Sequence, residues 1–246
     1  MSAQVELVRS EARLMTREPM ATFWVIAFPT ALLGVFALIP TFRDRVPELG
    51  GQTVLDLYVP INVTLALGFL GLFIIPGALA TYRERGVLRR LATTPVGPAR
   101  VVLAQLAVAA VVGVVGVSLL LAVAWGLLGT VVPVDVLPFA AALLLGLLAM
   151  LSVGVLVGAL SGTAKAATIA GNVLFFPMMF LAGLYVPVAV LGETMQRIGE
   201  LTPLGASALV MQRAAVGDPV GTLPFVAMAL WTLVPLAVAV RRFRWE

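Results

Sequence analysis

Apolar residues occupy six long stretches of the chain, and short polar segments separate them. The stretches cover about residues 21–40, 57–81, 101–128, 137–160, 166–186 and 220–240. A helix rises about 1.5 Å per residue, so about 20 apolar residues cross the roughly 30 Å hydrocarbon core of a bilayer. Strands of a membrane barrel are only about 10 residues long and alternate apolar with polar positions, unlike these continuous runs. The pattern predicts an all-α integral membrane protein with six transmembrane helices.

The composition agrees with this pattern. Of the 246 residues, 61% are hydrophobic and only 11% are charged, whereas soluble domains carry roughly 25% charged residues. The chain has no cysteine and no histidine. Their absence excludes disulfides, thiolate nucleophiles, Cys/His zinc sites and histidine acid–base chemistry. We therefore expect neither a catalytic site nor a metal site in this chain.

The charged residues predict the orientation of the spans. Six spans place both termini on the same side as the loops around residues 82–98 and 161–165. That side holds twelve of the 16 Lys and Arg residues, and the other four are Arg43, Arg45, Arg197 and Arg213. Because the side richer in Lys and Arg faces the cytoplasm, both termini are expected to be cytoplasmic. Since orientation accounts for the formal charge of +4, we expect no nucleic-acid partner.

Two shorter segments are amphipathic rather than apolar. Apolar residues recur at helical spacing in residues 3–18 and again in residues 188–203, with charged residues between them. The first segment predicts an interfacial helix on the cytoplasmic leaflet, although a charged tail is an alternative. The second segment is too short and too charged to span, so it lies in the interface or dips into the membrane and returns.

The fourth span carries glycines at four-residue spacing, namely Gly154, Gly158 and Gly162. Small residues at this spacing let two helix backbones approach closely in lipid. The pattern predicts close helix packing, either within one protomer or between the two protomers of a dimer.

No segment of the chain has the pattern of a nucleotide-binding loop. Such a loop needs several glycines and a lysine that together hold the phosphates. The single lysine, Lys165, lies in the sequence S-G-T-A-K-A-A, which does not fit that pattern. A transporter built from this chain and driven by ATP therefore needs a separate ATPase subunit.

Residues 82–98 form a basic segment between the second and third spans. On a helix with about 100° per residue, Val87, Leu88 and Leu91 fall on one face, and arginines project from the opposite face. A loop that only sets orientation needs charge but no apolar face. A face of this kind usually meets lipid or a groove on a partner protein. We therefore predict an amphipathic helix that binds a partner, with orientation alone as the simpler alternative.

The same segment resembles a family signature. Its sequence R-E-R-G-V-L-R-R-L-A-T-T-P is similar to the motif Glu-x-Gly-Thr-Leu-x-x-Leu-x-x-Thr-Pro of ABC-2 type permeases, the membrane subunits of ABC exporters. The matching residues are Glu84, Gly86, Leu88, Leu91, Thr94 and Pro95, whereas Val87 stands where threonine is usual. A second region, F-F-P-M-M-F-L-A-G-L-Y-V-P followed by L-T-P-L, resembles the fifth span and the re-entrant helices after it. The resemblance covers essentially the whole chain.

The resemblance implies a coupling helix at residues 83–94 that docks on the ATPase. The residues expected to form it are Arg83, Glu84, Gly86, Val87, Leu88, Leu91, Thr94 and Pro95. The implied fold is one ABC-2 type transmembrane domain over residues 1–246. It has six spans, an N-terminal interfacial helix, and extracellular re-entrant or interfacial helices before the last span.

The resemblance also implies partners and a setting. The family pairs two permease copies with two ATPase subunits, so a homodimer is expected, and a heterodimer with a similar permease stays open. No cofactor is expected on this chain, because ATP and Mg belong to the partner ATPase. The shortness of the chain resembles the drug-resistance subgroup in the inner membrane of prokaryotes. We expect export of a hydrophobic or amphipathic compound. The alternatives are a permease for lipid-linked glycans and a non-transporting component of a signalling or assembly complex.

Polar and aromatic residues of the fifth span are candidates for the translocation path. Asn172 is a polar side chain in an apolar span, so it either bonds a neighbouring helix or faces the path. The aromatic residues Phe175, Phe176, Phe180 and Tyr185 either line an apolar path or face lipid. The spans contain no charged residue, which argues against a transporter driven by an ion gradient.

Overall fold

The computed structural model describes residues 9, 13, 23–47, 51–87 and 98–242. In chain order its helices are η1 (Phe23–Ala27), α3 (Phe28–Ala37), η2 (Pro40–Phe42), α4 (Val54–Phe69), η4 (Leu70–Ile74), α5 (Ile75–Glu84), α7 (Pro98–Gly126), α8 (Val136–Leu160), α9 (Ala164–Leu181), η5 (Val188–Val190), α10 (Glu193–Leu201), α11 (Pro203–Val216) and α12 (Leu223–Arg242). Within these described ranges there is no β-strand, only an isolated bridge between Arg45 and Thr53. The predicted all-α membrane fold is confirmed.

Among the residues that the structure describes, five helical segments are long and apolar enough to cross a membrane, judged by length and composition. They are Val54–Glu84, Arg100–Gly126, Val136–Leu160, Ala164–Leu181 and Leu223–Arg242. The apolar helix at the first predicted span, Phe23–Ala37, is shorter. It ends before Pro40 because a proline excludes the α conformation from the residue before it, and Ile39 is extended, with φ −87° and ψ 111°.

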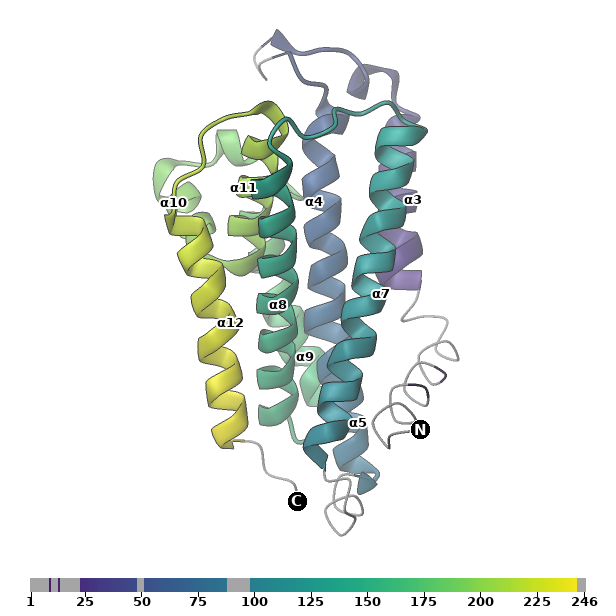
Figure 1. Cartoon of the computed structure of the whole chain (residues 1–246), viewed down its shortest axis with the longest axis vertical. Coiled ribbons are helices and arrows are strands. Elements are labelled where there is room, and N and C mark those ends of the chain that lie inside the picture. Colours follow the sequence, from purple (N-terminus) through teal and green to yellow (C-terminus); the bar gives the residue numbers. More distant parts are fainter. Residues whose placement is uncertain (1–8, 10–12, 14–22, 48–50, 88–97, 243–246) are drawn as a thin grey trace.

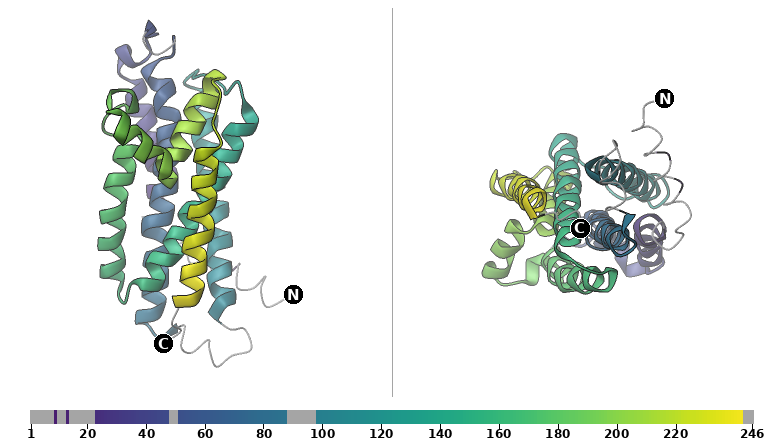
Figure 2. Two further views of the ribbon diagram at one scale, coloured as in Figure 1. Left: turned by 90° about the vertical axis from the view of Figure 1, so that its left-hand side faces the viewer. Right: turned by 90° about the horizontal axis from the view of Figure 1, so that it is seen from below.

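The long helices, among them α4, α7, α8, α9 and α12, run roughly parallel to the long axis of the molecule (Figure 1). One end of the bundle, called here the α5 end, carries the last residues of α5, α8 and α12 and the first residues of α7 and α9. The opposite end, called the α10 end, carries α10 and the segments 38–47 and 127–135. Seen from below, α8 lies between α12 on one side and α5 and α7 on the other (Figure 2).

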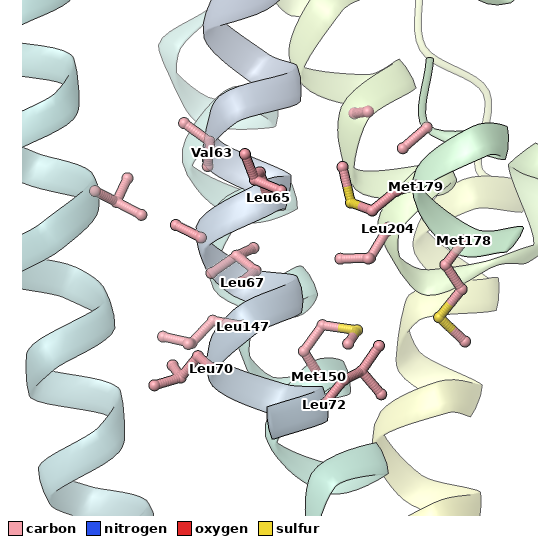
Figure 3. Close-up of a cluster of buried hydrophobic side chains, with 14 of the residues drawn as sticks. Val63, Leu65, Leu67, Leu70, Leu72, Leu147, Met150, Met178, Met179 and Leu204 are labelled. Carbon is pink, nitrogen blue, oxygen red and sulfur yellow. The ribbon is translucent and has the colours of Figure 1, made fainter. Parts of the chain in front are cut away.

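The core of the bundle forms where α4, η4, α8, α9 and α11 meet. Figure 3 shows Leu67, Leu70, Leu147, Met179 and Leu204 among the side chains of this core, and all five are buried. Helix α11 is buried along most of its length, which places it inside the bundle rather than on its surface. By contrast, only 28% of the apolar window of α9 and 28% of that of α12 are buried. Exposed apolar surface on such helices suits contact with lipid tails.

The glycines of the fourth span pack α8 within one protomer. A Cβ added to Gly154 would collide with the carbonyl oxygen of Gly71 in η4, and one added to Gly158 would lie 2.9 Å from Leu79 Cδ1. Gly162 has open space around it. Of the two alternatives for this pattern, the structure supports packing inside one protomer for Gly154 and Gly158, because a larger side chain at either position would push α8 away from η4 and α5.

The second span begins at Val54, three residues before the predicted start, because its first turn is capped. The side chain of Thr53 accepts a hydrogen bond from the Asp56 N–H (3.1 Å), and Asp56 Oδ2 accepts one from the Thr53 N–H (2.9 Å). Asp56 Oδ1 also accepts a hydrogen bond from the Val131 N–H at 2.7 Å. Asp56 therefore starts α4 and ties the α7–α8 loop to it.

Candidate coupling and translocation sites

The first residues of the predicted coupling segment lie at the end of α5. Arg83 and Glu84 are in its last turn, and Gly86 follows with φ +65°. A left-handed residue after a helix is most often glycine, because other residues pay a steric penalty there. The Gly86 N–H donates a hydrogen bond to the Arg83 carbonyl at 2.9 Å, which closes a turn directly after α5. Gly86 therefore has a structural reason to be a motif residue.

The Arg83 side chain bonds the last carbonyl groups of α8. Its Nη1 donates to the Ser161 carbonyl at 2.6 Å and to the Gly158 carbonyl at 3.3 Å, and its Nη2 donates to the Ala159 carbonyl at 3.2 Å. The last carbonyl groups of a helix have no partner within the helix and carry partial negative charge. A guanidinium satisfies several of them at once because its donors form a planar fork. Arg83 thus caps the C-terminal end of α8.

The neighbouring Glu84 bonds the first residue of α9. Its Oε1 accepts a hydrogen bond from the Ala164 N–H at 2.9 Å. The side chain of Thr163 accepts another from the Ala166 N–H at 3.1 Å, so two free N–H groups of the first turn are satisfied. The positive end of the helix dipole favours a carboxylate at this place. Two adjacent residues of α5 therefore hold the end of α8 and the start of α9 together.

The other predicted coupling residues divide into two groups. Val87 has a helical conformation and is partly buried. The rest, Leu88, Leu91, Thr94 and Pro95, lie outside the described residues, as does most of the predicted interfacial helix 3–18. The proposed coupling contact of the apolar face is thus a prediction from the sequence.

The candidate path residue Asn172 bonds its own helix. Its Nδ2 donates to the Thr168 carbonyl at 3.0 Å, one turn earlier in α9, and the side chain is partly exposed. One role expected for Asn172 was a hydrogen bond to a neighbouring helix, and its described contacts include no such bond. The polar group is accommodated by the backbone of α9 and faces the outside of the protomer together with exposed Val173 and Ile169.

The four candidate aromatic residues do not form one cluster. Phe175 is only 6% exposed and lies inside the bundle, whereas Phe176 is 57% exposed, and Phe180 and Tyr185 are also exposed. The reason is helical geometry, since residues 175 and 176 differ by about 100° around α9 and therefore point in different directions.

Phe175 instead belongs to an aromatic row that the sequence analysis missed. Its ring centroid lies 5.1 Å from that of Phe69 and 5.3 Å from that of Phe73. Phe69 in turn lies 5.3 Å from Trp24 and 5.8 Å from Phe28. Ring pairs at these separations attract one another beyond simple burial. The row joins η1 and α3 to the second span and to α9. The spacing of Phe69 and Phe73 indicates one helical face, but no sequence signal links it to residues 24 and 28.

The fold and these contacts define a multi-pass membrane protein whose second, fourth and fifth spans are joined at the α5 end. The family model of the ABC-2 type transporter matches residues 5–208, so the chain belongs to the ABC-2 type transporter family. This confirms the resemblance seen in the coupling motif and in the fifth span. The chain is accordingly a permease component, and permease domains of this family usually work with a separate ATPase subunit. No curated protein matches the chain.

Proposed function

We propose that this chain is the membrane subunit of an ATP-driven exporter that moves a hydrophobic or amphipathic compound out of the cytoplasm. Two copies pair with two ATPase subunits, which bind ATP and Mg. The α5 end of the bundle faces the cytoplasm, a proposal that the distribution of Lys and Arg supports. The membrane is the inner membrane of a prokaryote, as the resemblance to the drug-resistance subgroup implies. In this arrangement both termini are cytoplasmic, and α10 and α11 belong to the outer half of the membrane.

The observation that carries the proposal is the construction of the α5 end. The helix that leads into the family motif ends in two charged residues bonded to α8 and α9, and Gly86 then closes the helix in a left-handed conformation. A segment that transmits a conformational change from a partner must be rigidly attached to the membrane helices. Burial of Val87, Leu88 and Leu91 in a groove of the ATPase would contribute roughly 1.5 to 3 kcal/mol for each side chain before ordering costs.

The choice of an apolar compound rests on the face formed by η1, α3, the second span and α9. Its aromatic row is linked through Phe175 to Phe176, which is exposed, at a ring separation of 5.7 Å. Aromatic faces bind apolar molecules and organic cations. A permease for lipid-linked glycans would present polar groups for a sugar, and the exposed residues of α9 in this region are mainly apolar. The aromatic surface therefore favours hydrophobic and amphipathic compounds.

The experiment that tests the proposal combines co-purification with two charge insertions. The chain is purified with the ATPase that accompanies it, and hydrolysis of ATP is measured in lipid with amphipathic dyes and with lipid-linked glycans. We expect the dyes to stimulate hydrolysis. In the Leu88→Asp, Leu91→Asp double variant the chain should still insert, but the ATPase should no longer accompany it, because burial of an unpaired carboxylate is costly.

Arg89→Ala is the matched control, since residue 89 lies on the opposite face of the predicted helix, and this variant should keep the ATPase. A double variant that binds the ATPase normally would contradict the coupling role of this helix. Stimulation by the glycans alone would contradict the proposed class of compound.

A further inference from the structure

We propose that Arg83 and Glu84 act as positioning residues that make the second, fourth and fifth spans move as one unit when the ATPase acts. The contact between these two side chains and residues 158–164 is called the α5 joint. The proposal rests on the proposed function, because it states which helices move when the ATPase changes conformation. Neither residue is assigned a contact with the transported compound.

The first argument is the geometry of the α5 joint. Arg83 and Glu84 are adjacent in sequence, yet their partners lie 75 to 80 positions further along the chain. One bonds three carbonyl groups at the end of α8, and the other bonds the N–H of the first residue of α9. Each charge is opposite in sign to the partial charge of the helix terminus that it meets, so both contacts are attractive. A displacement of the end of α5 therefore pulls on both helices at once.

The second argument is that the same helices are locked together again deeper in the bundle. The backbone of η4 approaches both partners so closely that a Cβ on Gly154 of α8 would collide with the Gly71 carbonyl. A Cβ on Gly171 of α9 would likewise collide with the Leu72 carbonyl. Backbones in direct contact do not slide without loss of packing. Contact at two levels makes the three spans a rigid unit.

The third argument is the contrast with α7, the helix that begins at Pro98, after the coupling segment. It packs chiefly against η1 and against α4, the half of the second span that is remote from the α5 end, and it makes few contacts with α5 or α8. Among the described side-chain hydrogen bonds, none joins α7 to the turn between α8 and α9. Motion delivered to the loop is therefore expected to move α5, α8 and α9 together, relative to α7.

The experiment uses the complex of the full chain with the ATPase that co-purifies with it. Because the chain has no cysteine, spin labels can be placed through Arg85→Cys with Gly162→Cys inside the unit, and through Arg100→Cys with Lys165→Cys across its boundary with α7. All four positions are exposed. Electron paramagnetic resonance then measures both distances before and after the complex is trapped with ADP and vanadate.

The expected result has two parts. In the parent complex the distance inside the unit stays constant on trapping, and the distance across the boundary shifts. In the Arg83→Met, Glu84→Ala double variant, measured on the fraction that is isolated with its ATPase and has trapped nucleotide, the distance inside the unit broadens and the shift across the boundary is lost. Glu84→Gln keeps an oxygen that accepts the Ala164 N–H, so it should retain the shift.

Controls at the α10 end separate the α5 joint from a general loss of charge. Glu200 and Arg213 form a partly exposed ion pair with a separation of 4.0 Å. The Glu200→Ala, Arg213→Met variant removes the same two types of charge and should leave both distances unchanged. An unchanged shift in the Arg83→Met, Glu84→Ala variant would overturn the proposal, and so would a Glu84→Gln variant that behaves like Glu84→Ala. A parent complex that holds no ATPase, or that traps no nucleotide, would instead contradict the proposed function.

Discussion

The two ends of the bundle are each closed by one carboxylate that accepts a backbone N–H from a distant segment. At the α10 end, Asp56 bonds Val131 at 2.7 Å, and at the α5 end, Glu84 bonds Ala164 at 2.9 Å. The surroundings differ, because Asp56 is only 7% exposed and Glu84 lies in contact with solvent. A buried hydrogen bond to a charge is costly to lose, whereas water replaces an exposed one at little cost. The same chemistry therefore contributes more to folding stability at the α10 end, whereas at the α5 end it sets the position of α9 relative to α5.

The largest effect on stability is expected for Asp56→Ala. The change removes the cap of α4 and leaves the Val131 N–H without its partner, so the free energy of unfolding should fall by about 2 to 4 kcal/mol. Thermal unfolding of the purified protein in detergent measures the loss. Asp44→Ala removes an exposed carboxylate at the same end and should change the unfolding temperature very little. Equal losses in the two variants would show that Asp56 does not close this end.

Sequence reasoning anticipated these ends to different degrees. The pattern T-V-L-D at residues 53–56 is a capping box in front of an apolar run. The start of the second span at Val54 could therefore have been predicted from the sequence. The hydrogen bond from the Val131 N–H to Asp56 could not be predicted from the sequence, because it joins residues 75 positions apart. For the same reason the charges of Arg83 and Glu84 indicated a basic loop but not the two helix ends that they meet.

The helices before the last span show a second limit. The helical spacing of the exposed apolar residues Met195, Ile198 and Leu201 made α10 recognisable as an amphipathic helix. Helix α11 has neighbours on nearly every side, and small residues such as Gly205 and Ala206 fill its contacts. A helix surrounded by protein has no polar stripe, so periodicity did not define its bounds. The resemblance to the family implied re-entrant helices here, but not where α11 begins and ends.

A smaller effect is expected for Gly86→Ala, which tests the turn at the α5 end. A side chain at φ +65° costs about 1 kcal/mol, and the cost falls on the turn between α5 and the coupling segment. We expect hydrolysis by the bound ATPase to become less responsive to transported compound, with only a slight loss of thermal stability. The assay compares stimulated with basal hydrolysis.

Gly77→Ala is the matched control for this variant. Gly77 lies within α5, and a Cβ there would meet nothing within 4 Å. Alanine favours a helix over glycine by about 0.5 to 1 kcal/mol, so this variant should be as stable as the parent or slightly more stable, with normal stimulation. If Gly86→Ala and Gly77→Ala gave the same thermal stability and the same stimulation of hydrolysis, the left-handed turn at Gly86 would have no role in coupling.

The smallest effect on stability is expected for Asn172→Leu, midway between the two ends. Asn172 bonds only the Thr168 carbonyl among its described contacts, and that carbonyl belongs to its own helix. Its replacement by an apolar residue should therefore change the free energy of unfolding by no more than about 0.5 kcal/mol. If this face of α9 borders the path, the variant should shift the order in which different amphipathic compounds stimulate the ATPase, since one polar group has been removed from an apolar surface. Val173→Leu, at an exposed neighbouring position, removes no polar group and should preserve that order. An unchanged order in Asn172→Leu, with normal assembly, would move the path away from this face, whereas loss of the dimer would make the face a contact between protomers.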